Sequence, residues 1–230
     1  NIQGIFSGQL IGGSSGALKI AYPYLFSADS HILRIYDISN PQQPTLVSSL
    51  VLPDFVDRFI YLDNFLYAHH RAAYDGISII NVANPAEPSL EGCLPLTSRS
   101  YDFALGTYAY VAAIENGIEI VNVQSSTAPV STDTYVPPRS TESVNEPAFD
   151  IWHVAAVENI VYFVARSNEG NNPVSLHLLD SRDPKNPRLL DFQYQLASSF
   201  SPTHELMQCG PLLFAAQANE TFLFDISTPD

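Results

Sequence analysis

Positive charge is scarce in this 230-residue chain, which has ten Lys and Arg residues against 24 Asp and Glu. The formal net charge is −14, and the isoelectric point is near 4.6. Binding to the phosphate backbone of a nucleic acid or to an anionic lipid surface depends on clustered positive charge. The composition therefore argues against both kinds of partner.

Long apolar runs are also missing. The longest, at residues 159–165, has the length of a strand and falls well short of the ~18 residues of a membrane-spanning helix. Apolar residues still make up 46% of the chain, which is enough for a large core. We expect a folded, soluble protein without direct membrane insertion.

Cysteine is rare, with Cys93 and Cys209 as the only two. They are too few for a disulfide framework, and their surroundings lack the Cys/His spacing of a zinc site. We expect two small buried side chains. A single disulfide stays open, because sequence cannot show whether the two residues come within bridging distance.

One pattern recurs five times along the chain: a strand-like segment ends in Asp or Asn and is followed by a turn that usually contains Pro. The five residues are Asp37, Asn81, Asn122, Asp180 and Asp225, at spacings of 44, 41, 58 and 45. The longest spacing contains two polar, turn-rich insertions, residues 137–147 and 167–173. The period is therefore about 41–45 residues.

Each period contains four short strand-like segments and no sustained helical periodicity. In the second unit the segments are residues 56–62, 65–69, 77–82 and 89–94. Four strands in a repeat of this length are typical of a propeller blade. We predict an all-β, five-bladed β-propeller of four-stranded antiparallel blades. A β-sandwich is the alternative, but it would not predict five equivalent turns.

We expect residues 1–230 to form a single propeller domain. The expected blades are residues 17–52, 53–96, 97–136, 148–196 and 200–230. The fifth unit ends after its turn without an outer strand, whereas the strand-like residues 2–10 precede the first unit. We predict that residues 2–10 complete the last blade, which would close the ring and cover both free sheet edges.

The clearest copies of the repeat are residues 36–41 (Tyr-Asp-Ile-Ser-Asn-Pro), 76–85 (Gly-Ile-Ser-Ile-Ile-Asn-Val-Ala-Asn-Pro) and 108–112 (Tyr-Ala-Tyr-Val-Ala). These segments resemble the LVIVD-repeat β-propeller family; the copies at residues 124–129 and 181–182 depart from its pattern. The resemblance implies a propeller, frequently on secreted or cell-surface proteins. It implies no catalytic residue, because the shared motif is a turn.

Propellers usually place functional side chains where the innermost strands begin. Three units have an Asp near that point and a fourth has a His-Glu pair: Asp57, Asp102, Asp150, and His204 with Glu205. Four acids around one axis would repel one another unless a cation, Arg58, a His or bound protons compensated them. These acids, with His153 and His204, are the candidate site.

Three interpretations of the candidate site stay open. The carboxylates of Asp57, Asp102, Asp150 and Glu205 would suit a hard divalent cation such as Ca²⁺. With His153 or His204 as a partner, they would suit acid/base catalysis. Alternatively, each Asp caps backbone N–H groups at its own strand entry, as a repeated turn would propagate.

Two other features are weaker candidates. Residues 69–71 (His-His-Arg) end a strand, where neighbouring side chains face opposite ways, so we expect a solvated loop rather than a metal site. Trp152, the only Trp, would be able to stack on a sugar ring, although a lone Trp in a β protein is more often part of the core.

The sequence favours a non-enzymatic interaction or assembly module without a cofactor. Its faces and the insertions at residues 137–147 and 167–173 would contact another protein or a surface glycan. The alternative is a hydrolase or lyase that uses the carboxylates at the channel mouth, with or without a divalent cation. We expect secretion or cell-surface exposure from the family resemblance, from the presence of only two Lys residues and from a first residue, Asn1, that is not Met.

Overall fold

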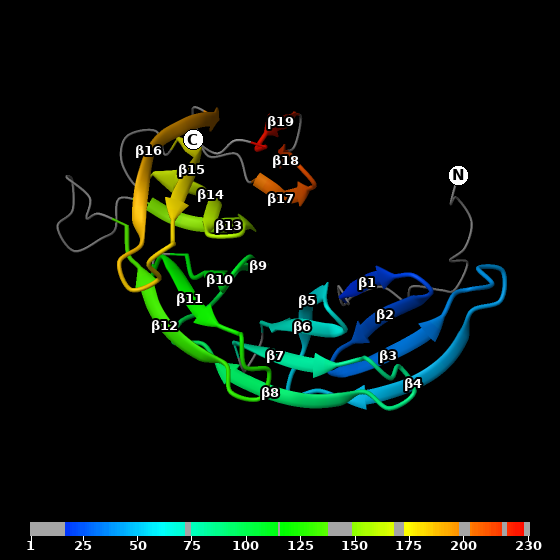
Figure 1. Ribbon diagram of the computed structural model, residues 1–230. Helices are drawn as coiled ribbons and strands as arrows, with labels where there is room; N and C mark the ends of the chain where they lie inside the picture. Colours follow the sequence, from blue (N-terminus) through cyan, green and yellow to red (C-terminus); the bar gives the residue numbers. More distant parts are fainter. Residues whose placement is uncertain are drawn as a thin grey trace. The chain divides into compact units, whose positions relative to one another are not determined.

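The computed structural model describes residues 17–71, 75–114, 116–137, 149–167, 173–197, 203–217 and 220–227. Strands are the only regular elements in these ranges, and they form five separate antiparallel sheets (Figure 1). The all-β fold class predicted from the repeats is confirmed. No helix in the described ranges is long and apolar enough to span a membrane.

Two sheets belong to the first of two compact units, which comprises residues 1–95 and 126–128. The strands of its first sheet are β1 (Leu18–Ala21), β2 (Tyr24–Asp29), β3 (Ile32–Asp37) and β4 (Thr45–Val51). Those of its second sheet are β5 (Val56–Leu62), β6 (Phe65–His70), β7 (Gly76–Asn81) and β8 (Ser89–Pro95). Each strand pairs with the next along the chain, so every sheet is a meander.

The second unit, residues 96–125 and 129–230, contains the other three sheets. Its first sheet is β9 (Asp102–Leu105), β10 (Ala109–Ala112), β11 (Ile118–Asn122) and β12 (Val130–Tyr135). The next is β13 (Phe149–Val157), β14 (Ile160–Ser167), β15 (Val174–Asp180) and β16 (Arg188–Ala197). The last described sheet has three strands, β17 (Thr203–Cys209), β18 (Leu212–Gln217) and β19 (Thr221–Asp225).

The four segments expected in the second unit correspond to β5–β8 with shifts of no more than one residue at their ends. Residues 2–10, and nearly all of the insertions at 137–147 and 167–173, lie outside the described residues. The closing strand and the two insertions therefore stay predictions.

The recurring Asp or Asn makes the same turn at the end of every third strand. In each turn the side-chain Oδ1 accepts a hydrogen bond of 2.7–3.0 Å from the backbone N–H two residues further on. The acceptors are Asp37, Asn81, Asn122, Asp180 and Asp225. The recurrence of these residues thus has a structural cause.

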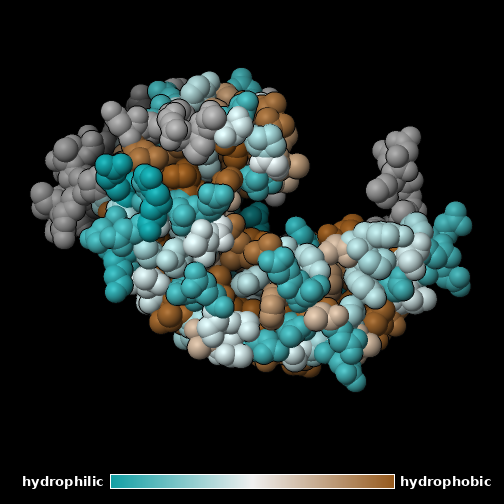
Figure 2. Space-filling model, in the orientation of Figure 1, coloured by the Kyte–Doolittle hydropathy of each residue, from teal (hydrophilic) through white to brown (hydrophobic). Residues whose placement is uncertain are grey.

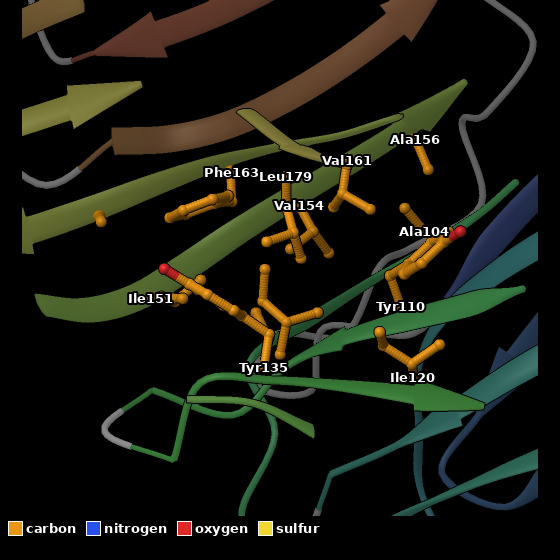
Figure 3. Close-up of a cluster of buried hydrophobic side chains, with 13 residues drawn as sticks. Ala104, Tyr110, Ile120, Tyr135, Ile151, Val154, Ala156, Val161, Phe163 and Leu179 are labelled. Atoms are coloured by element: carbon orange, nitrogen blue, oxygen red, sulfur yellow. The ribbon is translucent and has the colours of Figure 1, made fainter. Parts of the chain in front are cut away.

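The cores lie between facing sheets. In the first unit, Phe26, Leu33 and Ile35 cluster with Val56, Leu66 and Ile80 of the second sheet. In the second unit, buried side chains from β10, β11 and β12 meet others from β13, β14 and β15 (Figure 3).

Strand β14 is buried on both of its faces. Its side chains alternate between two clusters, with Val161 and Phe163 in one and Tyr162 and Val164 in the other. A strand that is covered by a different cluster on each side needs apolar side chains on both of its faces.

Gly117 lies in the turn between β10 and β11, at a position where no other residue fits. Its φ is +93°, and a Cβ there would lie 1.9 Å from the carbonyl oxygen of Tyr135 on β12. The outer strand therefore approaches the turn too closely for any side chain.

We expect Gly117→Ala to lower the free energy of unfolding by roughly 3 kcal/mol or more, because it combines backbone strain with a steric clash. Gly210→Ala is the matched control: Gly210 also has positive φ, +58°, but nothing lies within 4 Å of a Cβ there. Its cost should be about 1 kcal/mol. Urea unfolding of both variants measures the difference, and equal costs would contradict the role of the Tyr135 contact.

Candidate functional site on the inner strands

The first strands of three sheets carry a β-bulge close to their start, at Asp57 in β5, Trp152 in β13 and His204 in β17. A bulge adds one unpaired residue and turns its side chain to a new direction. Asp102 is the first residue of β9, and Asp150 lies two residues before the bulge of β13. The candidate acids therefore lie near the strand entries but at different positions in the strand pairing.

The candidate acids are divided between the two units, since Asp57 belongs to the first and Asp102 and Asp150 to the second. The backbones of His204 and Glu205 lie on β17, whereas their side chains are outside the described part of the structure. In the described ranges no three His, Cys, Asp or Glu residues form a group that could hold a metal ion. The Ca²⁺ site stays a prediction.

Asp102 and His153 form a buried pair that links β9 to β13. His153 Nδ1 lies 3.2 Å from Oδ2 of Asp102, and both side chains are more than nine-tenths buried. Because an ionised carboxylate only accepts, Nδ1 is the donor. The same carboxylate accepts hydrogen bonds from the backbone N–H groups of Val154, at 3.3 Å, and Phe103, at 2.8 Å. Three donors thus compensate this buried charge.

Aromatic rings connect this pair to a second ion pair. Tyr101 packs edge-on against both Trp152 and His153, with ring centroids 4.9 and 5.4 Å apart. The Arg166 guanidinium lies 5.8 Å from the centroid of Trp152. It also forms an ion pair with Asp150, its cross-strand partner. We call this set the inner-strand cluster: Tyr101, Asp102, Asp150, Trp152, His153 and Arg166.

The inner-strand cluster joins Asp102, Asp150, His153 and Trp152, all of which the sequence singles out. Sequence reasoning missed the role of Arg166, which lies near the end of β14 and is the cross-strand partner of Asp150 in the β13–β14 hairpin. Aligning the two strands of that hairpin would have paired them. Trp152 is only half-buried, and its Nε1 is buried without a hydrogen-bond partner in the described part of the chain.

In the first unit, Asp57 pairs mainly with Arg71. Its Oδ2 lies 3.4 Å from the Arg71 guanidinium and 3.8 Å from Nδ1 of His69. Burial, with smaller contributions from the charges of His70, Arg71 and Arg58, lowers the pKa of His69 to about 3. His69 is therefore neutral at physiological pH, and the ion pair at this strand entry is the one with Arg71.

The expected solvated loop at residues 69–71 is wrong for both histidines, which are completely buried. Their strand, β6, continues to His70, which pairs with Val56 and Gly76. His70 Nδ1 donates to the carbonyl oxygen of Asp54 at 3.1 Å, so its Nε2 accepts from Ser78 Oγ at 2.7 Å. Burial lowers the pKa of His70 as well.

The expectation of two buried cysteines is also wrong. Cys93 and Cys209 are both free and exposed. Each lies on a strand at the edge of its sheet, β8 or β17, where fewer neighbours cover the side chain.

His177 on β15 is a fourth buried histidine, after His69, His70 and His153. Its ring stacks on Phe163, with centroids 5.2 Å apart and planes inclined by 15°, and Ser175 Oγ lies 2.8 Å from its Nε2. Burial lowers the pKa of His177 from 6.5 to about 4. The folded protein therefore keeps this imidazole neutral.

We expect the free energy of unfolding to decrease as the pH falls from about 6.5 to about 4. In this window the unfolded chain binds a proton at His177 and the folded chain does not, which is worth roughly 2–3 kcal/mol. The buried His69 and His70 add to the same dependence, because their pKa values are lowered as well. His177→Phe should therefore reduce the slope by the share of one proton, measured by urea unfolding across this pH range. His31→Gln, at an exposed histidine, is the control and should keep the wild-type slope.

Five meandering antiparallel sheets, each with the same turn after its third strand, define a β-propeller-like repeat protein. The family model for the LVIVD repeat matches residues 12–51 and 103–135. These two segments thus match the LVIVD repeat, which is associated with β-propeller folds, and the resemblance noted in the sequence is confirmed. No curated protein matches the chain significantly.

Solved structures share the fold at low sequence identity. A functionally unknown protein from Desulfotomaculum acetoxidans DSM 771 is 10% identical with a TM-score of 0.67, over 90% of this chain and 64% of that one. A Lactobacillus plantarum protein is 12% identical with a TM-score of 0.65, over 91% and 66%. The computationally designed Ika8 protein is 12% identical with a TM-score of 0.59, over 91% and 57%. The chain therefore spans 57–66% of the length of these structures.

Proposed function

We propose that the protein is a non-enzymatic β-propeller interaction module, secreted or on the cell surface, whose partner is another protein or a surface glycan. In this proposal the five sheets are the blades of one closed ring, and residues 2–10 complete the last blade. The observation that carries the proposal is that Asp57, Asp102 and Asp150, the described carboxylates at the strand entries, all bond to other groups of the protein.

Each described carboxylate at a strand entry is held by partners from the scaffold itself. Asp102 accepts from His153 and two backbone amides, Asp150 pairs with Arg166, and Asp57 pairs with Arg71. A catalytic carboxylate instead needs a substrate within hydrogen-bond reach. Asp102 is only 3% exposed and its partner His153 only 6%, which leaves little access for a substrate. These contacts support a scaffold role for the acids.

The surface supports recognition by loops on a rigid frame. The face shown in Figure 2 mixes hydrophilic and apolar residues over the described strands, without one continuous apolar band. The net charge of −14 would repel nucleic acid and anionic lipid and leave proteins and neutral glycans as partners. The insertions at 137–147 and 167–173 distinguish the fourth repeat from the others, and such loops commonly carry binding residues.

We expect removal of residues 137–147, replaced by a short Gly-Ser linker, to leave folding intact and to weaken partner binding at least ~10-fold. Binding is measured first on a glycan array and by capture from an extracellular fraction, and then with the purified partner. A Gly-Ser replacement of residues 168–172 tests the second insertion in the same way. Unchanged binding by both variants would reject the assignment of recognition to the insertions.

The second candidate function is a hydrolase or lyase that uses the inner-strand carboxylates with or without a divalent cation, and the observation behind it is the geometry of the Asp102–His153 pair. A carboxylate that fixes an imidazole through Nδ1 is the arrangement that orients a general base. His153 would be the base and Asp150 a second carboxylate.

The two candidate functions predict different results for Asp102→Asn. If the pair belongs to the scaffold, the substitution lowers the free energy of unfolding by about 2 kcal/mol, because a buried donor loses its charged acceptor. The enzyme would instead keep wild-type stability and lose turnover on chromogenic ester and glycoside substrates, assayed with and without Ca²⁺. Asp57→Asn, at a more exposed pair, is the control and should cost less than ~1 kcal/mol.

A further inference from the structure

A cavity of about 1000 Å³ lies within the second unit, between strands β14, β15 and β16 of the fourth sheet and β19 of the last described sheet (Figure 1). Small-molecule sites in proteins typically have volumes of roughly 300–1,000 Å³. The buried part of the lining is mainly apolar, with Leu176, Leu178 and Ile226. The cavity therefore has the size and the kind of lining that a small apolar molecule needs.

Tyr162 on β14 brings a hydroxyl without a partner to this lining. The residue is 3% exposed, and its oxygen is buried with no hydrogen-bond partner in the part of the chain that the structure describes. A hydroxyl that is taken out of water without a new partner is unfavourable for folding. Burial also raises the pKa of this hydroxyl, so it stays protonated and keeps a proton to donate.

The preceding pair of sheets shows what a tyrosine at this position contacts. Tyr110 on β10 is the equivalent of Tyr162, because each pairs with the residue two positions before the recurring Asp or Asn of its sheet. The Tyr110 hydroxyl reaches the next sheet, where it lies 2.7 Å from Oγ of Ser181. Between these two sheets the hydroxyl is therefore satisfied.

Ile226 takes the place of Ser181 in the last described sheet. Both residues directly follow the recurring Asp. The backbone N–H of each donates to the turn between the first two strands of its sheet, at 2.8 Å for Ser181 and 2.7 Å for Ile226. An isoleucine side chain offers no oxygen, so the bond that Tyr110 makes has no equivalent at Tyr162. A ligand oxygen in the cavity would supply it.

The charges around the cavity argue for an uncharged ligand. Five charged residues line it: Glu158, Asp180, Arg182, Arg188 and Asp225. Arg182 and Asp180 form an ion pair with each other. The three acids outnumber the two arginines, and the whole chain has a net charge of −14, so a carboxylate or phosphate would be repelled. An ammonium group would have no acceptor for the Tyr162 hydroxyl.

We propose that this cavity binds an uncharged, largely apolar small molecule whose carbonyl oxygen accepts a hydrogen bond from Tyr162. Leu176 and Leu178 enclose its apolar body, and its oxygen takes the place that Ser181 Oγ has next to Tyr110. The inference goes beyond the proposed function, because it concerns a small molecule and not the macromolecular partner. It uses only described residues of the second unit.

Nile red, an uncharged apolar dye with a ring carbonyl, is the probe for the cavity. Its fluorescence rises when it leaves water for apolar surroundings, so a titration gives a dissociation constant. We expect saturable binding at a single site. Leu190→Trp, which fills the cavity from β16, should weaken binding at least ~10-fold. Leu46→Trp, at an exposed position on β4, is the matched control and should leave binding unchanged.

The dye titration also has outcomes that overturn the inference. Absence of saturable binding would do so, because it would mean that the chain itself fills the cavity. Equal affinities in wild type and Leu190→Trp would do so as well, because they would place the dye elsewhere on the protein. Circular dichroism of both variants checks that the sheets are retained.

Displacement of Nile red tests the hydrogen bond and the charge. The competitors 2-octanone, octane and octanoate have the same chain length and carry a carbonyl, no polar group and a carboxylate. We expect 2-octanone to bind roughly 5-fold more tightly than octane, because only the ketone accepts from Tyr162. Octanoate should bind more weakly than 2-octanone. Tighter binding of octanoate would overturn the assignment of an uncharged ligand.

Three variants test whether Tyr162 makes the bond. Tyr162→Phe should remove the preference for 2-octanone and leave the affinity for octane within ~2-fold. Ile226→Ser, which restores the residue found at Ser181, should reduce the preference because Tyr162 then has a partner in the protein. Tyr110→Phe removes the equivalent hydroxyl from the preceding pair of sheets and should keep the preference. A ketone preference that survives Tyr162→Phe would reject the role of this hydroxyl.

Discussion

One short hydrogen bond fixes the geometry of every repeat: the side chain of an Asp or Asn at the end of the third strand accepts from the N–H two residues further on. This bond ends the strand at a defined residue and turns the chain toward the fourth strand. The turn fixes where the fourth strand starts, because in four sheets the turn residue pairs with the residue eight positions further on. Strands β4, β8 and β12 then share a one-residue bulge after their second pair, whereas β16 departs from this register. The second strands β6, β10 and β14 are buried on both faces, as sheets built to one plan and packed on each other require.

The polar groups at the strand entries follow from the same plan. Packing one sheet on another leaves little water around the first strands, so a carboxylate there needs fixed donors. Asp102 obtains them from the neighbouring sheet and Asp150 from its own hairpin. His70 of β6 and His177 of β15 are accommodated differently, as neutral rings whose nitrogen atoms bond to hydroxyl or carbonyl groups.

The fold could be read from the sequence because its signals are periodic: the turn residues, the four short segments and the spacing all repeat. The side-chain partners could not be read in this way. A bulge shifts the strand pairing by one residue and has no recognisable pattern in the local sequence. The different positions of Asp57, Asp102 and Asp150 in the strand pairing could therefore not be predicted. The burial of His69 and His70 was missed because the strand continues past the last apolar residue. Arg166 was missed because its partner, Asp150, is adjacent only after the hairpin forms.

The bulge in the outer strands has a consequence for surface variation. Its extra residue is Val47 in β4, Glu91 in β8 and Thr132 in β12, so an apolar, an acidic and a hydroxyl side chain occupy the same place in the repeat. All three side chains are partly exposed, and none is paired with a residue on the neighbouring strand. At Glu91 and Thr132 the charge of the outer strand can therefore be altered without disturbing the pairing on either side, whereas Val47 also packs against the core of the first unit.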